Sequence, residues 1–125
     1  MDEAAVGRSL HEQGWRTVFT VDQMMAAWEQ FIATVELGYD DSIHEYLNDL
    51  SCRDWLHEAW QLLSDDKTTA WNTRLARLDE RFRRATVDVD QPLMDGPPGR
   101  WWLLRCPRLP TGEPATDLGG DQPAR

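Results

Sequence analysis

The chain lacks the features that would place it in a membrane or in a disulfide-bonded scaffold. No apolar run approaches the roughly 18 residues of a membrane-spanning helix, so no membrane contact is expected. Only two cysteines are present, Cys52 and Cys106, which suits a reducing cytoplasm. The first ten residues lack the basic and apolar regions of a secretory signal. Lysine occurs once against twelve arginines, which suggests a GC-rich genome. We therefore expect a cytoplasmic bacterial protein.

Motifs that mark common catalytic and cofactor sites are also missing. The sequence has no GxSxG, GxGxxG or Walker pattern, so serine-hydrolase, dinucleotide and P-loop chemistry have no support. His44, His57 and Cys52 are not arranged in the spacings that zinc sites use. Asp40 and Asp41 lack the acidic ladder and the glycine of an EF-hand. We predict no cofactor and no metal.

What the chain does have is a strong division of charge. Residues 20–66 hold eleven acidic residues and a single base, Arg53, for a net charge of −10. Residues 67–86 hold six bases and two acids, for a net charge of +4, and the whole chain carries −9. An acidic surface repels nucleic-acid phosphates and attracts basic proteins, so a basic protein partner is favoured over nucleic acid.

The clearest predicted helix begins after Thr20. Thr20 and Gln23 form a capping-box pattern, in which each side chain satisfies the other residue's backbone N–H. Gly38 is a suitable C-cap. Apolar residues recur between these ends at the three-to-four spacing of a core-facing helix: Val21, Met24, Met25, Trp28, Ile32 and Val35.

Two shorter helices are predicted next. Ser42 with Glu45, and Ser51 with Asp54, repeat the capping pattern. We favour two helices over one kinked helix across residues 43–63, because short polar side chains between the two patterns compete for backbone hydrogen bonds.

A long helix and a short strand complete the predicted elements. Ser64 and the two aspartates after it favour a helix start, and the apolar stripe that follows is the most regular in the chain: Trp71, Leu75, Leu78, Phe82 and Ala85. Residues 86–89 alternate and are β-branched, which predicts a strand whose partner would be residues 101–105, across a Pro/Gly-rich loop.

These elements predict a mainly α-helical protein. We expect a loose N-terminal arm at residues 1–18, with one helical turn around residues 9–13. A compact bundle of three or four helices is expected at residues 19–106, with room for a short C-terminal β-hairpin. Residues 107–125 are rich in proline and glycine, which predicts a disordered tail.

One group of residues could support catalysis. Glu45, Asp49, Arg53 and His57 follow one another at intervals of four and would share one face of a continuous helix. A carboxylate beside a histidine raises its basicity and fixes its tautomer, which makes Asp49, Arg53 and His57 the candidate catalytic residues of a small helical enzyme. The alternative is an exposed row of ion pairs, each of which stabilises a helix by only about 0.2–0.5 kcal/mol. We favour the ion pairs, and hence a protein that is not an enzyme.

The favoured function is protein–protein interaction. The predicted partner is a basic protein, such as a toxin held by an immunity or antitoxin protein, or a nucleic-acid-binding protein inhibited by mimicry of phosphate charge. Adjacent tryptophans in an extended segment point to opposite faces, so one can anchor a partner. The predicted partner-binding residues are Asp40, Asp41, Glu45, Asp49, Asp54, Glu58, Trp101 and Trp102.

The basic stripe has a separate interpretation. Arg74, Arg77, Arg81 and Arg84 lie on one side of the predicted long helix. We expect them to pair with the acidic half of the chain, either within the fold or across a homo-oligomer, in preference to binding phosphates.

Three strings carry a resemblance to a known group of proteins: GYDDSIHEYLNDLSCRDWLHE, RLDERFRRAT and WWLLRCPRLP. Together they resemble a family of small, mostly helical actinobacterial proteins of uncharacterised function. The resemblance spans residues 19–109. It implies a helical fold and implies no activity, cofactor or catalytic residue.

Overall fold

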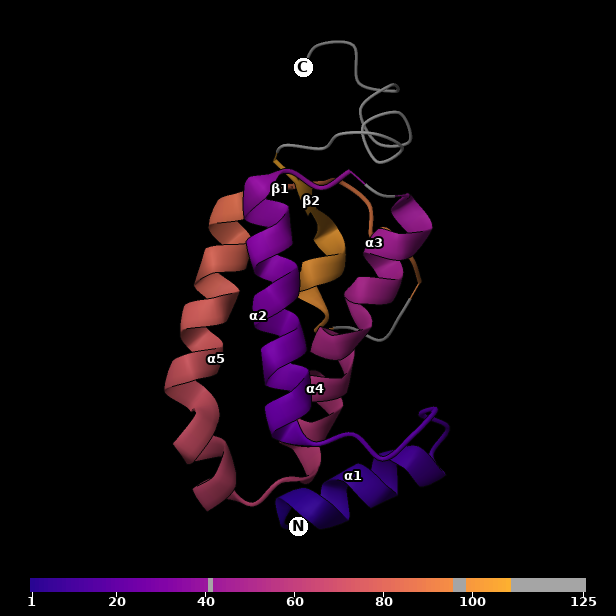
Figure 1. The fold of residues 1–125 in the computed structure, drawn as a ribbon, viewed down its shortest axis with the longest axis vertical. Helices are drawn as coiled ribbons and strands as arrows, with labels where there is room; N and C mark the ends of the chain where they lie inside the picture. Colours follow the sequence, from indigo (N-terminus) through magenta and orange to yellow (C-terminus); the bar gives the residue numbers. More distant parts are fainter. Residues whose placement is uncertain (41, 96–98, 109–125) are drawn as a thin grey trace.

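The structure, a computed structural model, describes residues 1–40, 42–95 and 99–108. The described residues form a mainly helical fold with a short antiparallel hairpin, as the sequence predicts (Figure 1). The elements in chain order are α1 (Glu3–Glu12), α2 (Val21–Leu37), α3 (Ile43–Asp49), α4 (Ser51–Leu62), α5 (Asp65–Ala85), β1 (Thr86–Asp88), the 3-10 helix η1 (Trp101–Leu104) and β2 (Arg105–Pro107).

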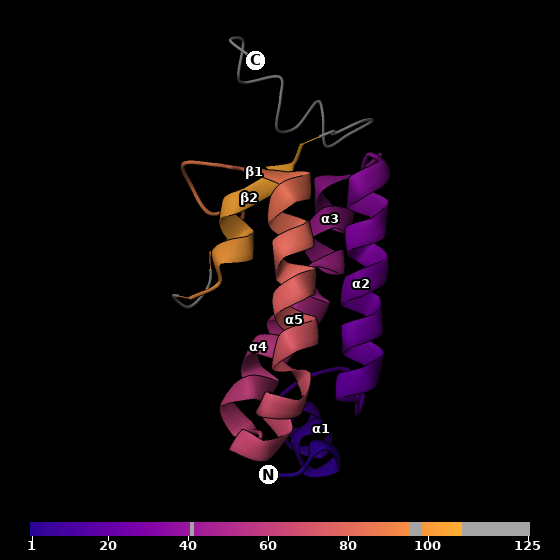
Figure 2. The same cartoon turned by 90° about the vertical axis from the view of Figure 1, so that its left-hand side faces the viewer.

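Helix α2 is the centre of the packing. It lies against both α4 and α5, and α2 and α5 run side by side along the long axis of the molecule (Figures 1 and 2). Helix α1 lies across the end where α2 begins, and the hairpin lies at the opposite end (Figure 1). The core therefore fills the space between α2, α4 and α5 and is closed by smaller elements at both ends.

Local signals in the sequence place α2 correctly. The Thr20 hydroxyl accepts from the Gln23 N–H at 3.1 Å, and the Gln23 side chain accepts from the Thr20 N–H at 3.0 Å. Gly38 ends the helix with φ 111°, a conformation that favours glycine. All six residues of the predicted α2 stripe are buried.

The prediction of two helices across residues 43–63 is confirmed, but one of the two predicted caps is wrong. Ser42 caps α3 by accepting from the Glu45 N–H. Ser51 is instead the first residue of α4, and no side chain caps this start. The reason is that Leu50, fully buried, keeps helical angles (φ −67°, ψ −15°), so the chain never adopts the extended conformation that a serine N-cap needs.

The N-terminal arm is not loose, which corrects the expectation for residues 1–18. Asp2 caps α1 by accepting from the Ala5 N–H at 2.8 Å. Val6 and Leu10, one turn apart, are fully buried. Between them, a Cβ on Gly7 would lie 2.4 Å from the Phe19 carbonyl oxygen, so glycine permits the close packing of α1 on the following loop. Two buried side chains give too short a pattern to indicate a helix in the sequence.

The hairpin forms with a partner different from the predicted one. β1 pairs with β2, Val87 opposite Cys106, whereas residues 101–104 form η1. Trp102 and Leu103 are both buried, which a helical turn allows and the alternating side chains of a strand do not. Arg108 also belongs to the fold, since its N–H donates to the Ala85 carbonyl at 2.9 Å. The rest of the predicted tail, residues 109–125, lies outside the described residues.

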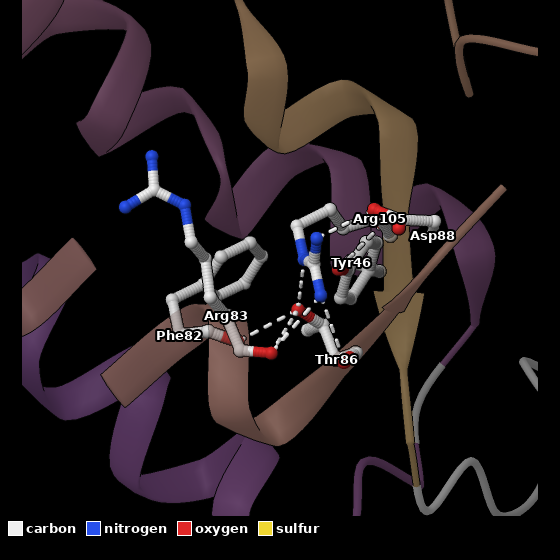
Figure 3. Close-up of polar contacts among 6 residues, drawn as sticks. All are labelled: Tyr46, Phe82, Arg83, Thr86, Asp88 and Arg105. Carbon is white, nitrogen blue, oxygen red and sulfur yellow. Dashed lines mark hydrogen bonds and ion pairs between the residues drawn. The ribbon is translucent and has the colours of Figure 1, made fainter. Parts of the chain in front are cut away.

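Arg105 connects the hairpin to the C-terminal end of α5 through hydrogen bonds (Figure 3). Its guanidinium donates to the carbonyls of Arg83 and Thr86 at 3.0 and 3.1 Å, to the Thr86 hydroxyl at 2.7 Å and to Asp88 at 2.6 Å. The Tyr46 hydroxyl donates to the Arg105 carbonyl at 3.1 Å, and burial raises the pKa of Tyr46. A cation at a helix C-terminus is stabilising, so these contacts are structural.

Candidate functional site

Arg53 is a core residue, contrary to the expectation that it lies on an exposed face. Its side chain is buried and donates twice to the Asp79 carboxylate, at 2.9 Å each. Trp28 Nε1 donates to the same carboxylate at 3.1 Å, and the guanidinium lies 4.4 Å from the centre of the Trp102 ring. Burying a charged pair requires such full partnering. These contacts explain Arg53 as a structural residue.

The structure does not bring the three candidate catalytic residues together. Asp49 accepts from the Tyr39 hydroxyl at 2.8 Å, whereas Arg53 donates to Asp79. His57 lies beside the Trp102 ring, with its Nε2 3.2 Å from the Gln61 amide. Burial, followed by the nearby arginines, lowers the pKa of His57. Arg53 and His57 both pack against Trp102, whereas the Asp49 carboxylate contacts Tyr39.

Two of the predicted partner-binding acids are occupied by an arginine from the C-terminal segment. Arg100 pairs with Asp54 at 3.1 Å and with Glu58 at 3.8 Å, and Trp102 Nε1 donates to Asp54 at 2.7 Å. We call these four residues the clasp. Trp102 is completely buried, so the prediction that it contacts a partner is wrong.

Trp101, the other predicted aromatic anchor, is half-buried. The Arg83 guanidinium lies 4.0 Å from the centre of its ring, and the Phe82 ring packs against it at 5.9 Å. This tryptophan is therefore already covered in part by α5.

The basic stripe pairs partly with the acidic half, as predicted. Arg81 makes a two-pronged contact with Glu36 of α2, at 2.8 and 3.1 Å, and this hydrogen bonding lowers the pKa of Glu36. Arg74 reaches Glu29 at 3.5 Å. Arg84 pairs within its own helix, and Arg77 makes no ion pair with the described residues. The stripe thus neutralises acids of α2 and leaves those of α3.

The acids around α3 remain exposed. We call Asp40, Glu45 and Asp49 the acidic face. Among the described residues no arginine or lysine pairs with any of the three, and the Asp49 carboxylate accepts a hydrogen bond from the Tyr39 hydroxyl. Glu45 and Asp49 are one turn apart on α3 and share a side of it. Asp41 lies outside the described residues.

An open groove of about 1270 Å³ lies next to the acidic face. One wall is the loop between α1 and α2, the floor follows α2, and the other wall is the α3–α4 junction including Asp49. Neither Arg53 nor His57 lines it. Sequence reasoning missed this groove, because its first wall is held in place by α1, and residues 1–18 show no sustained helical period.

The described residues bear on metal binding and on the Cys52 thiol as follows. They contain no group of three or more histidine, cysteine or acidic side chains placed to hold a metal. Cys52 is buried at the start of α4, and burial raises its pKa to about 12, so the thiol stays protonated. No helix in the described part of the chain has the length and apolarity to cross a bilayer.

The chain was also compared with known proteins. No family model, curated protein or solved structure matches it. The resemblance to small helical actinobacterial proteins therefore stays a prediction.

Proposed function

We propose that this protein is a non-enzymatic interaction protein whose acidic face docks a basic segment of a protein partner. The observation that carries the proposal is the unequal pairing of the acids. Glu29, Glu36, Asp54 and Glu58 are each paired with an arginine, whereas no arginine or lysine among the described residues pairs with Asp40, Glu45 or Asp49. Of the described acids predicted to bind a partner, internal pairing has therefore left these three uncovered on the surface.

The acidic face is suited to attract a cation. Glu45 and Asp49 are displayed on a helix that the Ser42 cap and the buried Tyr46 hold in place, so their positions are fixed before binding. Exposed charges of one sign accelerate association with an oppositely charged surface and select against wrong partners. A toxin or a nucleic-acid-binding protein with a basic surface fits this description.

The enzyme alternative has less support. General acid–base catalysis needs its groups within hydrogen-bond reach of one substrate. Asp49 lines the groove, while Arg53 is committed to Asp79 and His57 lies beside the clasp.

Peptide selection, followed by neutralisation of the acidic face, tests the proposal. Peptides are selected from a random display library on the immobilised protein, and their affinities are then measured by fluorescence anisotropy. We expect lysine- and arginine-rich peptides whose affinity falls steeply between low salt and about 0.5 M salt, where exposed charges are screened within a few ångströms. Neutralising the acidic face (Asp40→Asn, Glu45→Gln and Asp49→Asn together) should weaken binding by about tenfold, or about 1.4 kcal/mol.

A matched control removes the same charge elsewhere. Glu12, Asp90 and Asp95 are exposed and lie outside the acidic face, so Glu12→Gln, Asp90→Asn and Asp95→Asn together should leave the affinity within about twofold. Equal losses in the two triple variants would mean that only net charge matters. Affinity that did not change with salt would exclude docking through the acidic face.

A further inference from the structure

We propose that the groove along α2 binds an extended peptide segment with a large apolar side chain at its centre and a lysine or arginine at the end nearest α3. The inference rests on the proposed function, because that cation is the one the acidic face attracts. It adds the shape and the chemistry of the bound segment.

The length of the groove sets the length of the segment. The α2 residues that line it run from Gln23 to Thr34 and follow one side of the helix: Gln23, Met24, Ala27, Gln30, Phe31 and Thr34. Eleven helical steps cover about 16 Å. An extended peptide advances about 3.3 Å per residue, so about five residues fit along this stripe.

The floor of the groove favours an apolar side chain. Met24 and Phe31 line the groove although each residue is only 6% exposed, so the groove reaches down to the core. Between them, Ala27 is small and exposed, which leaves room for an incoming side chain. On the wall formed by the loop between α1 and α2, the half-buried rings of Trp15 and Phe19 add aromatic surface. Large apolar side chains that fill such pockets carry much of the binding energy in protein recognition.

The rims of the groove favour a peptide over a purely apolar ligand. Gln23 and Gln30 on α2, and Asn48 on α3, are exposed and line the groove. A side-chain amide both donates and accepts, so it can bond the N–H and C=O groups of a peptide whatever its side chains are. The Gln23 side-chain oxygen already accepts from the Thr20 N–H, so a lipid tail would leave the amides of Gln30 and Asn48 without partners.

The two ends of the groove differ in charge, which gives the bound segment a direction. Asp49 lies at the end near Phe31, because its partner Tyr39 packs edge-on against the Phe31 ring at 5.8 Å. Arg16 lies at the other end, with its guanidinium 5.3 Å from the centre of the Phe19 ring. A cation is therefore favoured beside Asp49, and a carboxylate beside Arg16.

The bound segment comes from another protein and not from this chain. Residues 109–125 contain three acids and one arginine, so their net charge of −2 is poorly matched to a groove beside three exposed carboxylates. A basic segment of a partner has the complementary charge.

Two neighbouring alanines provide the test. Ala27 lines the groove and Ala26, also exposed on α2, does not. Ala27→Trp should fill the groove and weaken the peptide selected above by at least about tenfold, while Ala26→Trp should change its affinity less than about twofold. Circular dichroism and urea unfolding of both variants confirm that each remains folded. Replacing the apolar residue of the peptide by serine should cause a loss similar to that of Ala27→Trp.

The outcomes separate this inference from the proposed function. If basic peptides bind with the expected salt dependence but with the same affinity to Ala27→Trp as to the wild type, the groove is not their binding site. That result would overturn this inference and leave docking through the acidic face supported. Peptides that need the groove but bind equally well at high salt and to the neutralised acidic face would overturn the proposed function. Sedimentation that shows a dimer of the wild type but not of Ala27→Trp would assign the groove to a second copy of the chain and overturn the partner peptide.

Discussion

The same acidic stretch of the chain produces two different surfaces. On the α4 side, Asp54 and Glu58 are enclosed in the clasp, next to the buried pair of Arg53 and Asp79. On the α3 side, Glu45 and Asp49 are exposed beside a groove. The two sides are separated by only a few residues of sequence, and both are rich in acids.

The two sides differ because a later segment of the chain covers the acids of one side and not those of the other. Residues 99–108 come back along α4 and bring one arginine and one buried tryptophan to its acids. Among the described residues no basic segment covers α3 in this way. An acidic residue in the sequence therefore indicates a binding surface only where the rest of the chain has not already supplied its cation.

The largest effect is expected where the closed side is most deeply buried. Asp79→Leu leaves the Arg53 guanidinium in the core without its counter-ion, and breaking a buried pair in this way costs about 3–5 kcal/mol of unfolding free energy. Urea unfolding measures this loss. The double change Arg53→Met with Asp79→Leu removes both charges and should recover much of it, although Trp28 Nε1 still loses its acceptor.

The result would bear directly on the comparison of the two sides. If Asp79→Leu cost less than about 1 kcal/mol, as exposed pairs do, the α4 side would be no more closed than the α3 side. A double variant no more stable than the single one would show that the pair is not what the substitution breaks.

A matched pair of substitutions compares the two sides with one chemical change. Asp54→Ala removes the acceptor of the buried Trp102 Nε1 and one partner of Arg100, and should cost about 1–3 kcal/mol. Asp49→Ala removes only a hydrogen bond from Tyr39 and should cost about 1 kcal/mol or less. Urea unfolding, with tryptophan fluorescence as the signal, measures both. Equal losses would contradict the division into a closed and an open side.

Much of the fold could be predicted because its signals are local. The capping box of Thr20 and Gln23, the glycine that ends α2 and the apolar stripes all act within a few residues of themselves. The short polar stretch near Asn48 likewise predicts the change from α3 to α4.

The candidate site could be predicted only in part, because its properties depend on distant segments. The burial of Arg53 requires Asp79, which is 26 residues further on, and the clasp requires Arg100. The groove requires α1, whose contact with the next loop depends on the absent side chain of Gly7. Asp40, Glu45 and Asp49 are exposed, as their charge predicts, and docking through them is our proposal.

The smallest expected effect is a pH dependence on the closed side. Burial, together with Arg53 and Arg100, lowers the pKa of His57 below its ordinary 6.5, so the folded protein prefers the neutral ring. The unfolded chain takes up this proton first as the pH falls. The stability that His57 contributes is therefore complete above about pH 6.5 and is lost as the pH falls towards the folded pKa. The variant His57→Gln removes this titration. The unfolding free energy of the wild type minus that of His57→Gln should therefore decrease as the pH is lowered from about 7.5 to about 5. The difference cancels groups that titrate alike in both proteins. If it increased instead, attraction of the charged ring to Asp54 and Glu58 would outweigh its burial, and the clasp would be open enough to accept another cation.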